Sequence, residues 1–414
     1  MAPFWTLSAA GFAATAIAYG PARMGFGLFL SQFRTEFSIS TQTAGLLSSL
    51  GFLGFLLGLL VAQGMTNRKG PRLPVTVGLS AATLGMAIVA ASPNLTVLGV
   101  GVFLAMSSAG LSWTPFNNAV HRRVADGSRP AALSLVSTGT GVGIALAGAA
   151  ALLMGLIGLS WRFCWAAFAI CGAVALVGNR MALRQVAGTD GAGPAQRWRM
   201  LRRRSAIPLL SIGLCYGTTS AIYISFAPDR IADAGGLAGL PPIAAGGLVF
   251  LCFGIFGLLG LLTGGAKAAL GLPWLVRLLK LAATVSLALV AVMPTWPGVI
   301  LSAGLQGIYV MMTSAVLAFW SDRLFPALPS QSFTAVLLAV AAGSVLGPAA
   351  AGFASDAMGS GPMFLAAAAL AGVTALVMRS RHIRERPEPD LEPGDEARYL
   401  AGRPDRPAPA PTAG

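Results

Sequence analysis

Arg23 stands in the middle of the first long apolar stretch of the chain, and its side chain could bind an anion. If this stretch crosses a membrane, a charge at that depth costs at least about 2.5–3.5 kcal/mol, so it needs a partner, water or a ligand. A planar guanidinium can hold a carboxylate or a phosphate with two parallel hydrogen bonds. Tyr19 and Phe26 lie four residues before and three residues after Arg23, so we expect all three on one helical face. Alternatively, Arg23 caps carbonyls where Pro21 breaks the helix, or it extends outward to the headgroups.

The acidic residues are informative through their positions. All fourteen fall in loops, at the ends of apolar stretches, in a central linker or in the tail, and Arg23 is the only ionisable side chain that we place well inside a span. A proton antiporter usually carries a buried carboxylate that loads and releases a proton. The sequence shows no obvious one, since we expect Asp229, Asp233 and Asp356 near the outer face. Together with Arg23, this absence favours a small organic anion as the substrate.

The composition is that of a polytopic membrane protein. The chain has 414 residues, of which 55% are hydrophobic and 10% charged, and its mean hydropathy is +0.74, whereas soluble domains carry roughly 25% charged residues. The net charge of +14 comes from basic residues in short loops, where membrane topology explains it, so we exclude nucleic acid as a partner. No cysteine has metal-ligand spacing, and no phosphate-binding loop is present. We expect no metal, no cofactor and no enzymatic activity.

Twelve stretches are long and apolar enough to cross a membrane, which takes about 20 residues. Basic residues gather in alternate loops, so the positive-inside bias places both termini in the cytoplasm and the protein in the cytoplasmic (cell inner) membrane. The fold class predicted is an all-α polytopic membrane protein. The stretches are about 7–30, 44–65, 73–91, 95–120, 131–157, 161–180, 207–228, 241–266, 273–293, 297–320, 331–355 and 361–379.

The two halves of the chain resemble each other. Ala44-Gly45 begins a pattern that recurs at Ala245-Gly246, and three glycines recur at the same spacing, Gly139, Gly143 and Gly148 as Gly343, Gly347 and Gly352. Two parallel repeats meet at an interface where a substrate can sit. We expect a six-helix bundle at 1–180, a basic cytoplasmic linker at 181–206, a second six-helix bundle at 207–380 and a disordered cytoplasmic tail at 381–414.

These features resemble a bacterial transporter of the major facilitator superfamily over residues 1–380. The segment Asn67-Arg68-Lys69-Gly70-Pro71-Arg72 stands where the superfamily has its charged loop between helices 2 and 3, with Asn in place of the acid. The glycine-rich helices 5 and 11 are similar to those of its drug/proton antiporters, and we expect them to meet helices 8 and 2 across the halves. The resemblance implies gating roles for Asn67, Arg68, Gly70, Arg72, Gly139, Gly143, Gly343, Gly347 and Pro348.

The resemblance also implies that helices 1, 4, 7 and 10 line a central cavity. The polar and aromatic residues expected there to bind substrate are Arg23, Tyr19, Phe26, Trp113, Asn117, Tyr216, Ser220, Tyr223, Gln306 and Tyr309. We expect a monomeric secondary active transporter among membrane lipids that moves a small organic solute by alternating access, with a coupling proton or ion left open. The alternatives are a proton-coupled multidrug or metabolite efflux pump, and a non-transport membrane sensor or scaffold on the same fold.

Overall fold

The computed structural model describes residues 3–184, 206–325, 329–378 and 383. These residues form helices, apart from short connections and one isolated β-bridge between Leu237 and Leu240. The central segment 185–205 and nearly all of the tail lie outside the described residues, so the linker, the disordered tail and the domain boundaries stay predictions.

The helices before the central segment form the first half of the molecule. Their bounds are α1 (Pro3–Tyr19), α2 (Pro21–Leu28), α3 (Leu30–Phe37), α4 (Thr41–Lys69), α5 (Arg72–Ala90), α6 (Leu95–Arg123), the short η1 (Asp126–Ser128), α7 (Arg129–Leu156) and α8 (Trp161–Ala182).

The helices after the central segment form the second half. They are α9 (Ala206–Asp233), η3 (Pro242–Ala244), α10 (Ala245–Gly257), η4 (Leu258–Leu262), α11 (Thr263–Leu270), α12 (Leu272–Val292), α13 (Trp296–Leu324), α14 (Pro329–Met358) and α15 (Ser360–Val377). Among the described residues, eleven helical segments are long and apolar enough to cross a membrane, with Pro242–Leu270 counted as one. They coincide with eleven of the twelve stretches predicted, which confirms a multi-pass, all-α membrane protein.

The first predicted span is broken into three helices. Pro21 begins α2, and a proline disfavours helical backbone in the residue before it, so the break falls at Gly20. A Cβ at Gly20 would overlap the backbone of Gly143 in α7, and glycine therefore permits the close approach at this bend. A second break follows at Phe29, between α2 and α3. Together the three helices reach from Pro3 to Phe37, beyond both ends of the predicted stretch 7–30.

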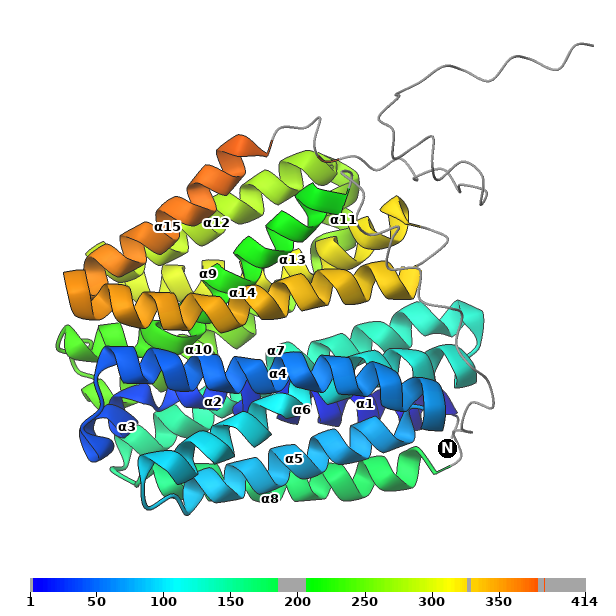
Figure 1. Cartoon of the computed structure of the whole chain (residues 1–414), viewed down its shortest axis with the longest axis horizontal. Coiled ribbons are helices and arrows are strands. Elements are labelled where there is room, and N and C mark those ends of the chain that lie inside the picture. The colour runs from blue at the N-terminus through cyan, green and yellow to red at the C-terminus, as the bar shows by residue number, and fades with distance from the viewer. Residues whose placement is uncertain (1–2, 185–205, 326–328, 379–382, 384–414) are drawn as a thin grey trace, which may run out of the picture.

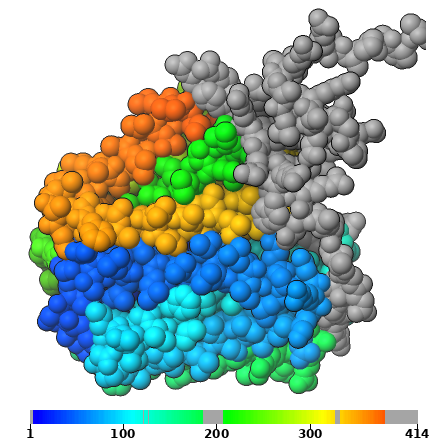
Figure 2. All heavy atoms as spheres, viewed as in Figure 1, coloured from blue at the N-terminus to red at the C-terminus, as the bar shows by residue number. Residues whose placement is uncertain are grey.

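The two halves pack against each other along two helix pairs. In the first half α4 and α5 contact α6, α5 contacts α8, and α1 contacts α7; in the second, α9 contacts α14, and α12 contacts α13 and α15. Between the halves, α4 lies along α14 and α7 lies along α10 (Figure 1). The face in Figure 2 shows α14 packed along α4. This confirms that helices 5 and 11 meet helices 8 and 2.

The ends of the helices follow local sequence signals. Ser40 and Asn94 cap α4 and α6 by accepting hydrogen bonds from backbone amides of the first turn. Gly70 ends α4 and Gly271 ends α11, each with φ of 74°, a backbone conformation that favours glycine. The two glycines occupy matching positions in the repeat, because each ends its helix in a backbone conformation that favours glycine.

Candidate functional site

Arg23 lies among aromatic rings between α2 and α4. Its guanidinium carbon is 4.3 Å from the ring centroid of Phe55, 5.4 Å from that of Tyr19 and 5.6 Å from that of Phe52. The ring of Tyr19 in turn meets Trp113 of α6 edge to face, with centroids 6.4 Å apart. Stacking on aromatic faces stabilises the cation without neutralising it, since a ring carries no net charge.

No carboxylate or carbonyl accepts a hydrogen bond from Arg23 within the described residues, and its Nε atom is buried without any partner. The helix does break beside Pro21, but the guanidinium does not cap the carbonyls freed there. The predicted grouping of Tyr19 with Arg23 agrees with the geometry. Phe26 is directed elsewhere and stacks on Phe33, with centroids 5.8 Å apart. Arg23 and Phe26 both belong to α2, where a separation of three residues turns their side chains about 60° apart around the helix axis.

The second half contributes a pair of tyrosines that adjoin Arg23. Tyr216 of α9 is buried within electrostatic reach of Arg23, and its hydroxyl donates to the carbonyl of Val310 at 3.1 Å. Its ring meets the ring of Tyr309 of α13 edge to face, with centroids 5.6 Å apart. The hydroxyl of Tyr309 lies 3.2 Å from the Oγ1 atom of Thr219. The predicted residues Tyr19, Arg23, Tyr216 and Tyr309 therefore form one connected cluster across the two halves.

Lys280 of α12 completes this cluster and corrects a prediction. Its side chain is only 1% exposed, and Nζ donates to the hydroxyl of Tyr309 at 3.1 Å. We expected Arg23 to be the only ionisable residue well inside a span, and this expectation is wrong. The lysine is held by a neighbouring helix that the superfamily resemblance does not assign to the cavity, so a search restricted to helices 1, 4, 7 and 10 misses it.

The other predicted substrate residues differ in their hydrogen bonding. The buried Tyr223 shares a hydrogen bond with Ser302, and Ser220 donates to the carbonyl of Tyr216 in its own helix. The amide of Gln306 is fully buried, and neither of its polar atoms has a partner; the side-chain oxygen of Asn117 is also buried and unpaired. Unsatisfied polar groups in a membrane cost several kcal/mol each. These two amides are therefore suited to bind water or a ligand.

The glycines of α7 divide between two neighbours. A Cβ at Gly139 or Gly143 would overlap the backbone of α1, in the same half. At Gly148 it would overlap the backbone amide of Leu251 in α10, and at Gly141 it would lie 2.9 Å from the side chain of Leu258. Thus Gly141 and Gly148, and not the predicted Gly139 and Gly143, face the other half.

The same division holds in α14. Gly343 and Gly347 approach the backbone of α9 within the second half. The carbonyl of Pro348 instead meets Gly45 of α4, where a Cβ would overlap it. Of the predicted gating residues in this helix, Pro348 therefore lies between the halves. The loop residues Asn67, Arg68 and Arg72 are exposed where α4 ends and α5 begins.

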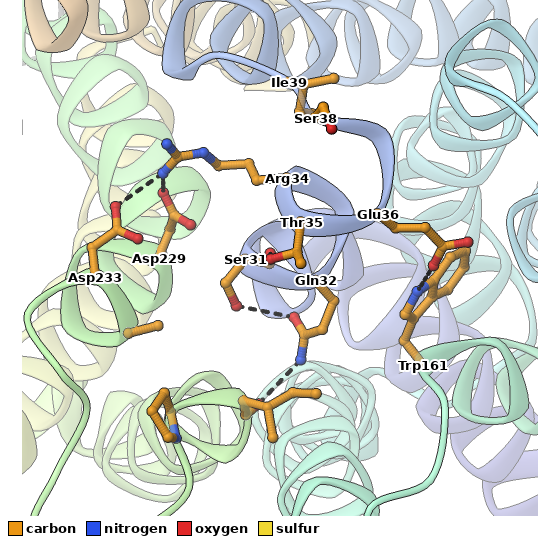
Figure 3. Close-up of a pocket in the computed structure, with 13 residues that line it drawn as sticks. Ser31, Gln32, Arg34, Thr35, Glu36, Ser38, Ile39, Trp161, Asp229 and Asp233 are labelled. Atoms are coloured by element: carbon orange, nitrogen blue, oxygen red, sulfur yellow. Dashed lines mark hydrogen bonds and ion pairs between the residues drawn. The ribbon is translucent and has the colours of Figure 1, made fainter.

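The end of the molecule that carries α3, called the outer end after the positive-inside prediction, is closed by contacts between α3 and α9. Arg34 Nη1 lies 2.5 Å from Asp229 Oδ2 and 3.0 Å from Asp233 Oδ2 (Figure 3). The side chain of Asp229 is only 5% exposed. The expectation that the chain has no buried carboxylate is thus wrong for Asp229, although this acid lies at the end of its helix and already has a cationic partner.

Backbone contacts reinforce the closure one turn deeper. A Cβ at Gly27 of α2 would overlap the carbonyl oxygen of Ile224 in α9. The hydroxyls of Ser48 in α4 and Ser225 in α9 lie 2.5 Å apart and are buried. A depression of about 650 Å³ lies outside this closure, next to Arg34, Glu36 and Trp161 (Figure 3). It is separate from the cluster around Arg23.

Sequence comparison decides the family. The model of the Major Facilitator Superfamily matches residues 11–327. The chain belongs to this superfamily. No curated protein matches the sequence.

Solved structures of superfamily-like transporters share the fold at low sequence identity. The nucleoside transporter NupG is 13% identical, with a TM-score of 0.70 over 91% of this chain and 98% of its own. A POT family transporter in complex with 5-aminolevulinic acid is 14% identical, with a TM-score of 0.72 over 90% and 94% of the two chains. A bacterial homologue of the human lysosomal transporter Spinster, inward-facing and unoccupied, is 16% identical, with a TM-score of 0.68 over 94% and 98%. At these identities the likeness concerns the fold alone.

In the superfamily's numbering of crossings, α1–α3 form helix 1, α6 helix 4, α9 helix 7 and α13 helix 10. The cluster of Tyr19, Arg23, Tyr216 and Tyr309 draws on helices 1, 7 and 10, and Trp113 of helix 4 joins it through Tyr19. The contacts of the first crossing with α9 are concentrated in α2 and α3, its two outer segments. The end of the molecule that carries α3 is therefore the one that these contacts close.

Proposed function

We propose that the protein is a secondary active transporter that moves a small organic anion across the cytoplasmic membrane, with Arg23 as the anion-binding residue. The observation that carries the proposal is the guanidinium of Arg23, which lies inside the bundle on three aromatic rings without a carboxylate partner among the described residues. An anionic ligand would supply the missing partner. The surrounding rings favour an anion with an apolar or aromatic body, since aromatic rings offer few hydrogen-bonding groups to a polar body.

Alternating access is supported by how the closure is built. The outer contacts join α2 and α3 to α9, whereas the long pairs α4–α14 and α7–α10 join the halves through small residues. Rocking about these pairs would break the Arg34–Asp229 ion pair and expose the cluster to the outer side. We further propose that both termini are cytoplasmic and that the transporter works as a monomer.

Thermal stabilisation of the purified protein by a panel of ligands tests the substrate class, because binding stabilises the folded state by mass action. The panel pairs anions with neutral analogues, for example benzoate with benzamide and succinate with succinamide, and adds inorganic phosphate and cationic dyes. We expect anions to stabilise the protein and their amides not to do so. Stabilisation by cationic dyes alone would instead indicate the efflux pump that the sequence left as an alternative.

The variant Arg23→Gln ties the effect to the residue. It should fold, because an amide is more easily buried than an unpaired cation, and it should bind the stabilising anion roughly ten- to hundredfold more weakly. Arg162→Gln is the matched control, since Arg162 is bound to Glu36 on the outside of the same half. Equal anion binding and transport in Arg23→Gln and the wild type would overturn the proposal.

A further inference from the structure

Lys280 is a buried ionisable residue that the proposed binding of an anion at Arg23 does not by itself explain. Its ammonium nitrogen is enclosed by α12, α13 and α9 and donates to the hydroxyl of Tyr309. Leucine or methionine would fill the same space without needing a hydrogen-bond partner, so packing alone does not explain a lysine here. An ionisable amine is retained here although burial in a membrane disfavours its charged form.

The elements that pack against α12 provide no acid to neutralise Lys280. Facing groups are the phenol of Tyr309 from α13 and the thiol of Cys215 from α9, and from α15 the hydroxyl of Thr374, which donates to that thiol at 3.3 Å. The charged residue on α11 is Lys267, whose ammonium lies over the ring of Phe319, and the other charge on α12 is Arg277, which stacks on Trp274. At the outer end, Asp229 and Asp233 pair with Arg34 and Glu36 pairs with Arg162, so none of these acids neutralises Lys280.

Two tyrosines link Lys280 to Arg23, by direct contact as far as Tyr216 and by electrostatic interaction from Tyr216 to Arg23. Lys280 touches Tyr309, the ring of Tyr309 meets the ring of Tyr216, and Tyr216 is within electrostatic reach of Arg23. Two like charges therefore share one low-dielectric region, where charges interact over longer distances than in water. Arginine stays protonated in proteins, whereas a buried lysine can release its proton. If one of the two cations is discharged when no anion is present, it is Lys280.

We propose that Lys280 carries the proton that is bound together with the anion. In the empty transporter Arg23 is charged and Lys280 is a neutral amine. When an anion with one negative charge binds at Arg23, the Nζ atom of Lys280 takes up one proton from the solution. The site then holds two positive charges and one negative charge, so its net charge of +1 is the same empty and loaded. This inference rests on the proposed anion substrate and adds its coupling ion.

The hydrogen bonds around Tyr309 allow both states of Lys280. The ammonium donates to the Tyr309 oxygen, and the phenol proton can then point to Thr219 Oγ1, which itself donates to the carbonyl of Cys215 at 2.8 Å. The neutral amine has a lone pair and accepts the same phenol proton instead. Rotation of one hydroxyl satisfies each state, so neither leaves the tyrosine without a partner. Because the proton is bound together with the anion, the transporter would carry both in the same direction.

The proton on Lys280 can be observed directly, because the chain has only three lysines, Lys69, Lys267 and Lys280. In the full chain with Lys69→Arg and Lys267→Arg, the remaining lysine is labelled with ¹³C at its ε carbon and followed by NMR from about pH 6 to about pH 9, the range in which a buried lysine can titrate. Without ligand, we expect the amine form to appear within this range. Both Arg23→Gln and saturating benzoate should keep Lys280 in the ammonium form to a higher pH. Ammonium throughout, or a titration that Arg23→Gln does not move, would overturn the inference even if anions bind.

The linkage also has a functional readout. The affinity for benzoate should fall by up to about tenfold for each pH unit over which Lys280 is discharged, because one proton is bound with the anion. Lys280→Arg keeps the charge permanently, so it should bind benzoate at low pH and lose the pH dependence. Asp229→Asn is the control for the other buried ionisable group and should leave the pH dependence in place. An unchanged pH dependence in Lys280→Arg would assign the proton to another residue. If no anion in the panel stabilises the protein, the substrate proposal fails. The titration without ligand still tests whether Lys280 releases its proton.

Discussion

The guanidinium of Arg23 lies 4.3 Å from the ring centroid of Phe55, so that a charge of the first crossing is held on the face of an aromatic ring of α4. Nothing in the described part of the chain neutralises this charge. The pair thus couples the position of α2 to that of α4, and α4 is the helix of the first half that packs against α14. This coupling can be measured without knowledge of the substrate.

The variant Phe55→Leu should destabilise the protein more when Arg23 is present than in an Arg23→Gln background. Leucine is also apolar but has no aromatic ring. The difference between the two destabilisations therefore reports the cation–ring interaction, which we expect to contribute about 1 kcal/mol. Unfolding free energies from reversible denaturation in mixed micelles give the four values of the cycle. Phe26→Leu is the control, since Phe26 stacks on Phe33 and should show no coupling to Arg23. Additive effects at Phe55 would contradict the prediction.

The variant Arg34→Gln should open the outer end. It leaves Asp229 buried without its cation, and truncation of one partner of a buried pair costs about 3–5 kcal/mol, here in the closed state. Spin labels at Thr35 and Ala234, both exposed near the closure, report the distance between α3 and the end of α9. We expect a longer distance to become populated.

Arg230→Gln is the matched control for that experiment. Arg230 also belongs to the outer end of the molecule, but it donates to the carbonyl of Ala291 within the second half. Its loss should leave the distance between the spin labels unchanged. A distance that shifts equally in both variants would mean that the closure does not depend on the Arg34–Asp229 pair.

The variant Glu36→Gln should have little effect. Glu36 accepts from Arg162 at 2.5 Å and from Trp161 at 2.6 Å, but all three side chains belong to the first half, and the ion pair is about one-third exposed. Exposed ion pairs contribute about 0–1 kcal/mol. We expect a small fall in melting temperature, with transport and the outer distance unchanged. A loss of transport would show that the halves communicate through this pair.

The variant Gly148→Ala should impair transport. Its new Cβ would overlap the backbone amide of Leu251, so α7 and α10 must move apart, and overpacking of this kind costs about 1–3 kcal/mol. Gly64→Ala is the matched control, because no atom lies within 4 Å of a Cβ there. It should be neutral or slightly stabilising, as alanine favours a helix by up to about 1 kcal/mol over glycine. Equal transport in the two variants would contradict a role of the α7–α10 contact in the motion.

The spans could be predicted because the membrane constrains them, whereas the pairing of the halves was implied by the resemblance to the superfamily. A crossing must satisfy every backbone hydrogen bond within a helix, so length and hydropathy locate it. The bends at Gly20 and Phe29 were not located, since the first depends on a close approach to Gly143 that no local pattern reveals. The burial of Asp229 was missed for a related reason. Its partner Arg34 is 195 residues away in the chain.

Two further features are readable from the sequence alone. Lys280 lies between leucines in a strongly apolar stretch that also holds Arg277, and an average over the stretch hides the two charges, which inspection of each residue reveals. The glycines of α7 could have been sorted by angle. At about 100° per residue, Gly143 and Gly148 point about 140° apart, whereas Gly141 and Gly148 differ by only about 20°. The second pair is the one that shares a face toward α10.

The contact of Gly27 with the carbonyl of Ile224 has a consequence for leakage. A barrier made of side chains fluctuates open whenever a rotamer changes, within picoseconds to nanoseconds. Here two main chains touch, and no bond rotation in a side chain separates them. Only displacement of a whole helix, which takes microseconds to milliseconds, can admit water or ions. At this contact a leak therefore requires the same helix motion that opens this end, and substitutions at the neighbouring ion pair can change the rate of opening without making the closed state porous.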